Sequence, residues 1–153
     1  MLGLFKRKPV DFFSEGEKKS IVHAIEQAER RTSGEVRIYI ESHCSHPDPV
    51  ERAKELFGEL KMYETAARNG VLVYLAMKDR KLAVYGDEGI HLKVGDTFWD
   101  ASVKNMLGHF NKNNFTAGIT EIIREIGEAL STHFPFDEKG DTNELSDEIV
   151  FGR

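Results

Sequence analysis

The spacing of hydrophobic residues changes from a helical to an alternating pattern in the first third of the chain. Between Ser14 and Gly34, apolar residues recur every three or four positions, which predicts an amphipathic helix. Ser14 and Glu17 have the spacing of a capping box, and Gly34 is suited to end the helix. From Glu35 the apolar residues occupy every second position, and residues 36–40 are therefore expected to form a strand.

The middle of the chain predicts a second helix followed by two strands. Asp48 is expected to cap this helix, with Pro49 at its first position. The apolar run "VLVYLAM" (71–77) is typical of a central strand that is buried on both faces. A short turn at 78–80 leads into a strand over 82–85, whose simplest role is that of hairpin partner.

The stretch "VYGDEGIHLKVGD" (84–96) starts as the end of that strand and is then expected to become an acidic loop punctuated by glycines. Asp96 is expected to cap a third helix, whose apolar stripe runs over 99–110. A loop at 111–114 separates this helix from a fourth, which has its apolar stripe over 119–130.

The predicted element order is α-β-α-β-β-α-α. A strand–helix–strand unit forms a right-handed crossover, so the first two strands should be parallel and the third should return antiparallel. The expected fold class is α/β, an α/β/α sandwich with a small mixed sheet. We expect one domain over 13–134, a loose N-terminus over 1–12, and an acidic C-terminal tail over 135–153. The segment "EIVF" (148–151) in that tail has a second interpretation, as a strand that adds to a sheet edge or engages a partner.

Composition narrows the class of protein. The 153 residues are 40% hydrophobic, enough for one packed core. The net charge of −5 argues against a nucleic-acid binder, which needs a basic face. Cys44 is the single cysteine and no apolar run is long enough to span a bilayer, so a cytoplasmic location is expected.

The predicted topology gathers acidic residues at one end of the sheet. The starts of two parallel strands and the end of an antiparallel third lie together, with the third helix entering beside them. Hard cations such as calcium or magnesium prefer oxygen ligands of this kind. An ordinary solvated turn explains the same residues, and spacing alone leaves both interpretations open. The candidate ligands are Glu35, Asn69, Asp87, Glu88, Asp96 and Asp100.

Other chemical motifs are weaker. The "HCSH" stretch (43–46) holds ligand types that suit zinc, but no second Cys/His pair accompanies it, so a surface loop with a free thiol is the better interpretation. The sequence contains neither a P-loop nor a nucleophile elbow.

Three stretches carry a resemblance to a known family: "SGEVRIYI", "ARNGVLVYLAMKDRKLAVYGDEGI" and "NNFTAGITEIIREIG". Through them the chain resembles the TPM domain family, and it looks closest to small bacterial members. The family includes a thylakoid lumen protein with reported acid phosphatase activity and a photosystem II repair factor. The resemblance implies an α/β/α sandwich and a divalent-cation site on loops at the end of the sheet, with calcium reported in some members.

The same resemblance places Glu88 on the glutamate of the family's Gly-x-Glu-Gly motif and Asp96 near its loop aspartate. Many members have a hydrophobic residue where this chain has Asp87, and they carry signal peptides and transmembrane tails that are not seen here. These departures count against an extracytoplasmic location.

Three functions follow. The first is a non-catalytic module that binds a divalent cation, with calcium expected and magnesium as the alternative ion. The second is a weak metal-dependent phosphomonoesterase, implied by the family, in which a metal polarises a phosphoryl group. The third is a scaffold that binds an unidentified protein partner through the C-terminal tail or an open sheet edge.

Overall fold

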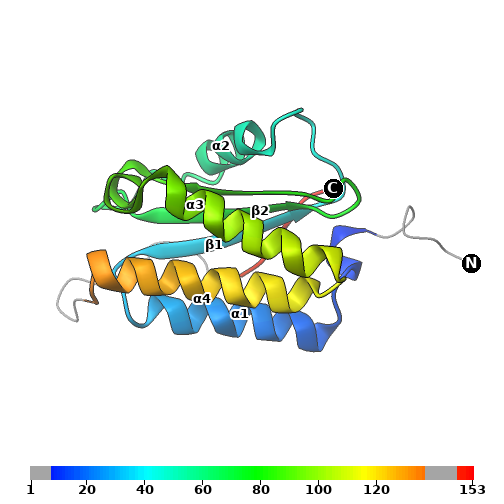
Figure 1. Cartoon of the computed structure of the whole chain (residues 1–153), viewed down its shortest axis with the longest axis horizontal. Helices are drawn as coiled ribbons and strands as arrows, with labels where there is room; N and C mark the ends of the chain where they lie inside the picture. The colour runs from blue at the N-terminus through cyan, green and yellow to red at the C-terminus, as the bar shows by residue number, and fades with distance from the viewer. Residues whose placement is uncertain (1–7, 137–147) are drawn as a thin grey trace, which may run out of the picture.

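The computed structural model describes residues 8–136 and 148–153 of the chain (Figure 1). In chain order its elements are a 3₁₀ turn η2 (Pro9–Asp11), α1 (Glu15–Glu29), β1 (Glu35–Glu41), α2 (Pro49–Glu59), β2 (Gly70–Ala76), β3 (Lys81–Gly86), α3 (Glu88–Asn111), α4 (Phe115–His133) and β4 (Val150–Phe151).

A four-stranded sheet forms the middle layer, in the order β3-β2-β1-β4. β1 and β2 run parallel, and β3 returns antiparallel to β2, which confirms the predicted directions. α2 covers one face of the sheet, and α1 and α4 cover the other (Figure 1). α3 packs against α4 and against the edge strand β3. The predicted α/β sandwich with a mixed sheet is therefore confirmed.

The central strand β2 holds the two sides of the core together. All seven of its residues are buried, as the unbroken apolar run predicts. Val71 and Val73 face the larger core, which α1, α3 and α4 complete. Leu72 and Tyr74 point to the opposite face and pack beneath α2. The alternation of side chains along a strand gives each face its own cluster.

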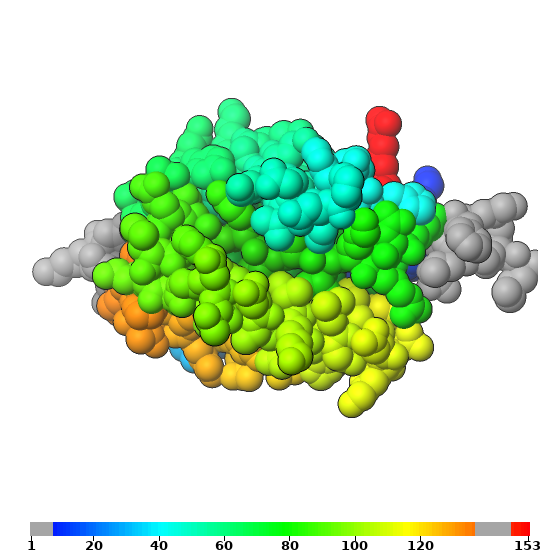
Figure 2. Space-filling model, turned by 45° about the horizontal axis from the view of Figure 1, so that its top comes forward, coloured from blue at the N-terminus to red at the C-terminus, as the bar shows by residue number. Residues whose placement is uncertain are grey.

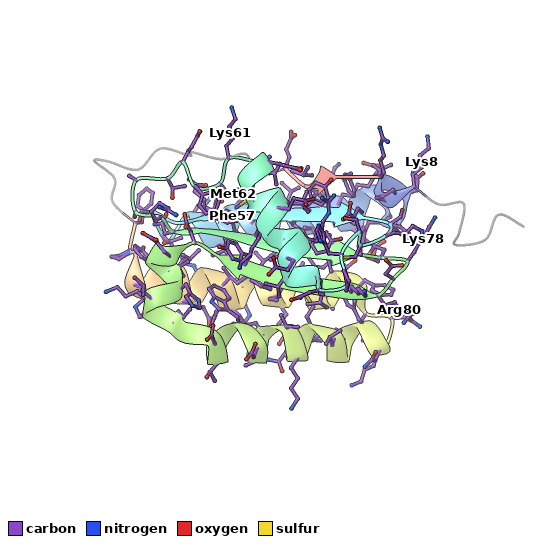
Figure 3. All side chains as sticks on the ribbon, turned by 90° about the horizontal axis from the view of Figure 1, so that it is seen from above. Lys8, Phe57, Lys61, Met62, Lys78 and Arg80 are labelled. Atoms are coloured by element: carbon purple, nitrogen blue, oxygen red, sulfur yellow. The ribbon has the colours of Figure 1, made fainter. Side chains whose placement is uncertain are left out.

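The smaller core lies under α2. Phe57 from this helix and Met62 just after it are fully buried and lie close together (Figure 3). Lys61 marks the end of the sheet at which β2 begins, while Lys78 and Arg80 mark the opposite end, at the turn between β2 and β3 (Figure 3). These two ends carry the two groups of polar residues described below.

Helix α1 begins as predicted. The backbone N–H of Glu17 donates to Ser14 Oγ (3.1 Å), and the backbone N–H of Ser14 donates to Glu17 Oε1 (3.0 Å). This capping box lowers the pKa of Glu17, chiefly through the hydrogen bond from the Ser14 backbone. Asp48 caps α2 in the predicted way, because its side chain accepts a hydrogen bond from the Val50 N–H (2.9 Å).

The prediction of an acidic loop after β3 is wrong, because most of these residues are helical. α3 begins at Glu88, eight positions before the predicted cap at Asp96, and residues 88–94 are helical. Asp87 is the N-cap and Glu88 lies in the first turn, a favourable combination at the positive end of a helix. Gly95 interrupts α3 with a non-helical φ of 75° and ψ of 174°, so α3 consists of two helical segments joined at a kink. Asp96 lies at the start of the second segment, where a helix start was predicted, but α3 as a whole begins earlier, at Glu88.

The C-terminal tail supplies a strand. Val150 pairs with Tyr39 and Phe151 with Ile40, in a parallel register on the free edge of β1. Of the two interpretations of "EIVF", addition to a sheet edge is the one that the structure has. The rest of the expected tail, residues 137–147, lies outside the described residues, as do residues 1–7 of the expected loose N-terminus. No helix in the described part of the chain has both the length and the apolar character needed to cross a membrane.

Candidate functional site

Asp87 joins the end of β3 to the start of α3. Its N–H donates to the Gly70 carbonyl (2.9 Å), and its Oδ1 accepts from the Glu88 N–H (2.8 Å). Arg68 donates two hydrogen bonds to the same carboxylate, one from Nε to Oδ2 (2.7 Å) and one from Nη2 to Oδ1 (2.8 Å). The Asp87 carboxylate is buried and both of its oxygens already accept hydrogen bonds, so its first role is structural.

The backbone around Arg68 is shaped for this contact. Arg68 has φ 53°, an uncommon conformation for a residue other than glycine. Its carbonyl accepts from the Gly89 N–H (2.8 Å), and a Cβ at Gly89 would lie 2.2 Å from the Ala67 carbonyl oxygen. Only glycine allows this close approach. The Asp87 carboxylate raises the pKa of Arg68, mainly by hydrogen bonding, so this guanidinium remains charged.

Two other predicted ligands, Glu35 and Asn69, are buried at the same end of the sheet. The Glu35 N–H donates to the Asn69 carbonyl (3.3 Å), and Asn69 Nδ2 donates to Ser33 Oγ (3.3 Å). Asn69 Oδ1 is buried and accepts no hydrogen bond from the described residues. The structure therefore brings Glu35, Asn69 and Asp87 to one end of the sheet, as the topology predicts.

A groove runs along β3 between α2 and α3, with a volume of about 800 Å³. We call it the β3 groove. Residues 82–86 form its floor, Val50 and Lys54 lie on the α2 side, and Trp99 lies on the α3 side. In Figure 2 the helices α2 and α3 stand on either side of this part of the molecule. Asp87, Glu88, Asp96 and Asp100 also line the groove, whereas Glu35 and Asn69 do not.

The exposed acidic side chains of the β3 groove have only loose partners. The side chains of Glu88 and Asp96 are 69% and 88% exposed. Arg68 Nη1 lies 3.8 Å from Glu88 Oε1, and His91 Nε2 lies 3.5 Å from Asp96 Oδ1. Trp99 Nε1 donates to His91 Nδ1 (3.0 Å), which fixes the ring so that Nε2 points to the carboxylate. These carboxylates are therefore accessible to a cationic ligand.

The described residues contain no preformed cluster of metal-binding side chains. Within 8–136 and 148–153, no group of three or more His, Cys, Asp or Glu side chains is arranged to hold a metal ion. The six predicted ligands therefore converge only in part. Glu35 and Asn69 are buried at the end of the sheet, whereas Glu88, Asp96 and Asp100 are exposed in the adjoining β3 groove. The earlier start of α3 causes the difference, because it spreads the acidic residues along a helix and its kink.

The opposite end of the sheet holds a second polar cluster. Arg52 donates from Nε to Glu41 Oε2 (2.9 Å) and from Nη2 to Glu41 Oε1 (3.0 Å), and the Tyr74 hydroxyl also donates to Glu41. Burial, followed by this hydrogen bond, raises the pKa of Tyr74. All three side chains satisfy one another, which is the expected state of buried polar groups.

The "HCSH" stretch lies at this second end as well. His43 Nδ1 contacts Asp79 Oδ1 (2.8 Å), and His46 Nε2 contacts Glu55 Oε2 (3.0 Å). The hydrogen bond with His43 lowers the pKa of Asp79. Cys44 is a free thiol whose Sγ donates to the His46 carbonyl (3.2 Å). The histidines are thus separately engaged, in agreement with the interpretation as a surface loop.

Sequence reasoning missed the partner of Asp87 and the partner of His91. Arg68 precedes Asp87 by 19 positions, and the only sequence signal is the break at Arg68-Asn69-Gly70 before a buried strand. Trp99 belongs to the predicted apolar stripe and is buried in the core, and its indole N–H also donates to His91, which lines the β3 groove. An aromatic side chain with a polar tip serves both purposes.

Comparison with known proteins identifies relatives. Residues 7–129 match the family model of the TPM domain. The NMR structure of the BA42 protein from the psychrophilic bacterium Bizionia argentinensis is 39% identical, covers 93% of this chain and 97% of that one, and superposes with a TM-score of 0.84. The N-terminal domain of cg2496 from Corynebacterium glutamicum is 13% identical, covers 89% and 88%, and has a TM-score of 0.64, so it shares the fold alone. No curated protein compared with the chain matches it.

Proposed function

Since the chain belongs to the TPM domain family, we propose that it is a non-catalytic module that binds a divalent cation and mediates an interaction with another protein. The proposed ion is calcium, and magnesium is the competing one. The proposed ligands come from the acidic end of the β3 groove, where Glu88, Asp96 and Asp100 are exposed.

One observation carries the cation proposal: three exposed carboxylates of α3 line one groove, and the nearest guanidinium is already engaged. Arg68 is held by Asp87 and reaches Glu88 only at 3.8 Å. Hard cations take carboxylate and carbonyl oxygens, and calcium tolerates irregular, partly hydrated coordination. The left-handed backbone at Gly95 gives Asp96 a different direction from the preceding turn of the helix.

The predicted ligands fit this proposal unequally. Glu88, Asp96 and Asp100 have accessible oxygens, so they would hold the ion in the open part of the groove. Asp87 uses both of its oxygens on Arg68 and the Glu88 N–H, so it would shape the site without binding the ion. Asn69 offers a buried amide oxygen with no hydrogen-bond partner in the described part of the chain, next to the buried Glu35. A bound cation would supply positive charge that neutralises the exposed carboxylates.

Calcium titration followed by amide NMR shifts tests this proposal. At about millimolar calcium we expect shifts at Glu88, Asp96 and Asp100. The double variant Glu88→Gln, Asp96→Asn should weaken binding about tenfold or more, because it removes two charged oxygen ligands. Glu128→Gln, an exposed glutamate of α4, is the matched control and should bind calcium like the parent chain. Absence of shifts at these three residues contradicts the cation proposal.

The weak phosphomonoesterase is the alternative function. A phosphatase usually needs a cationic group directed at the phosphoryl oxygens. Arg68 is the guanidinium of the β3 groove, and its bidentate bond to the buried Asp87 competes with that role. This contact favours the non-catalytic proposal. Metal-dependent turnover of an aryl phosphate that is lost in the Glu88→Gln, Asp96→Asn double variant and kept in Glu128→Gln would favour the enzyme instead.

We also propose a cytoplasmic location. Cys44 is the only cysteine of the sequence and is a free thiol, which suits a reducing compartment. Cell fractionation tests the proposal, and recovery of the protein from an extracytoplasmic fraction contradicts it.

A further inference from the structure

We propose that the β3 groove binds an extended peptide segment of a partner as a fifth strand on the open edge of β3. A basic side chain of this segment would lie at the acidic end of the groove, beside Glu88, Asp96 and Asp100. The proposal names a partner for the interaction role proposed above and rests on it, but it requires no bound cation.

The ladder between β2 and β3 identifies the backbone groups that face the groove. The Asp87 N–H donates to the Gly70 carbonyl, and these two residues lie directly opposite each other. In an antiparallel pair, such hydrogen-bonded positions recur every second residue. The N–H and C=O groups of residues 81, 83 and 85 therefore point to β2. Those of Leu82, Val84 and Gly86 point away from β2, to the open edge of the sheet.

The surface of the groove agrees with an open edge. Five consecutive residues, 82–86, line it, whereas one face of a strand would present only every second residue. The side walls are apolar and accessible. Six large hydrophobic side chains of the described residues are exposed, and three of them, Val50, Tyr63 and Leu107, line this groove. An edge with free backbone groups and apolar side pockets is the arrangement used in strand addition.

Charge defines one end of the bound segment. Asp87, Glu88, Asp96 and Asp100 line the end at which α3 begins. Arg68 binds Asp87 through two hydrogen bonds and reaches Glu88 only at 3.8 Å, so the acidic side chains outnumber the guanidinium beside them. Farther along α3, Lys104 replaces these acidic residues. A lysine or arginine at one end of the peptide would therefore find opposite charge, and a glutamate there would meet repulsion.

Shape favours a peptide over a second copy of the chain. The edge of β3 lies between α2 and α3, which rise on either side of it (Figure 2). A second copy would present its own β3 between the same two helices, so the helices would collide before the strands could pair. A single extended segment carries no flanking helices, so it can approach the edge of β3 without this collision. The chain already uses this mode of binding on its other edge, where Val150 and Phe151 pair with β1.

The probe is a short fluorescent peptide in which valine and threonine alternate, with one arginine at its amino or carboxyl end. Binding is measured by fluorescence anisotropy in the presence of a chelator, so a failed calcium titration leaves this test intact. At least one of the two peptides should bind, and replacing arginine by glutamate should weaken it about tenfold, the worth of about two exposed charge contacts. Methylating the peptide nitrogens that would face β3 should weaken it by about tenfold or more, because it removes backbone hydrogen bonds.

Variants and amide exchange locate the site. The double variant Asp96→Lys, Asp100→Lys should weaken the arginine peptide about tenfold, while the charge reversal Glu128→Lys on α4 should leave its affinity unchanged. Bound peptide should slow hydrogen exchange at the amides of Leu82 and Val84. No binding, equal binding of the methylated peptide, or unchanged exchange at these amides overturns the proposal. Slow exchange that appears without peptide as the protein is concentrated assigns the edge to a second copy and also overturns it.

Discussion

The two edges of the sheet are finished in different ways. The edge of β1 is covered by the chain itself, because Gly152 N–H donates to the Ile40 carbonyl (2.8 Å) and Ser42 N–H donates to the Arg153 carbonyl (2.9 Å). The edge of β3 has no strand beside it in the described part of the molecule. It lies instead at the floor of a groove between α2 and α3.

This difference separates two ways of managing an exposed edge. An unpaired strand is a template for unwanted pairing, and proteins cover it or restrict access to it. On β1 the backbone groups are used internally, so this edge is closed to a partner while β4 is in place. On β3 access is limited by the flanking helices, so the edge excludes another sheet but admits a single strand. The β3 edge is therefore the one suited to an interaction role.

The largest expected effect comes from the junction that starts α3 beside β3. Arg68→Ala leaves the buried Asp87 carboxylate without its guanidinium and should give the largest loss in the free energy of unfolding of the substitutions compared below. Arg124→Ala is the matched control, because Arg124 pairs with Glu128 on the exposed face of α4, and it should cost at most about 0.5 kcal/mol. Urea unfolding measures both, and equal losses would mean that the junction does not hold α3 in place.

The covered edge gives the second effect. Phe151→Ala removes a half-buried ring that packs against the main core and should cost about 1.5 kcal/mol. The exchange of the Ser42 amide should also become faster, because β4 separates more often from β1. Phe136→Ala, at an exposed phenylalanine, is the control and should cost at most about 0.5 kcal/mol. An unchanged unfolding free energy for Phe151→Ala would contradict a closed β1 edge.

Tyr85 on β3, which lines the groove, should make the free energy of unfolding depend on pH in the alkaline range, with a smaller effect than the two substitutions above. Burial raises the pKa of Tyr85 on β3 to about 12. The neutral phenol therefore favours the folded state fully below its unfolded pKa of about 10, and this contribution is lost as the pH rises through about 12. The parent chain should lose about 0.5 kcal/mol more than Tyr85→Phe across that window, after allowance for the partial exposure of the ring. Equal pH dependence of the two proteins in urea titrations would show that the groove does not shield Tyr85.

Much of the fold could be predicted from local patterns. The capping residues Ser14 and Asp48 start their helices as expected, because a cap depends on neighbours only two or three positions away. The directions of β1, β2 and β3 followed from the crossover rule. The start of α3 could not be chosen correctly, because both Asp87 and Asp96 have the chemistry of a cap. Only tertiary contacts from Arg68 and Gly70 select Asp87.

The candidate site was less predictable than the fold. The sequence placed Glu35, Asn69 and Asp87 at one end of the sheet, and they are there. It gave no indication that Arg68 would adopt positive φ and engage Asp87, since this contact depends on the close approach of Gly89 to the preceding loop. The strand at Val150 was one of two open interpretations, because two residues are too short for a pattern to distinguish.

Native-state hydrogen exchange, read by NMR for each amide, tests the contrast between the two edges most directly. The Ser42 amide donates to Arg153 on the covered edge, whereas the Val84 amide points to the open one. We predict that Val84 exchanges faster than Ser42 and faster than its neighbours Ala83 and Tyr85, which donate to β2. Protection of Val84 equal to that of Ala83 and Tyr85 in a dilute sample without peptide would contradict an open β3 edge.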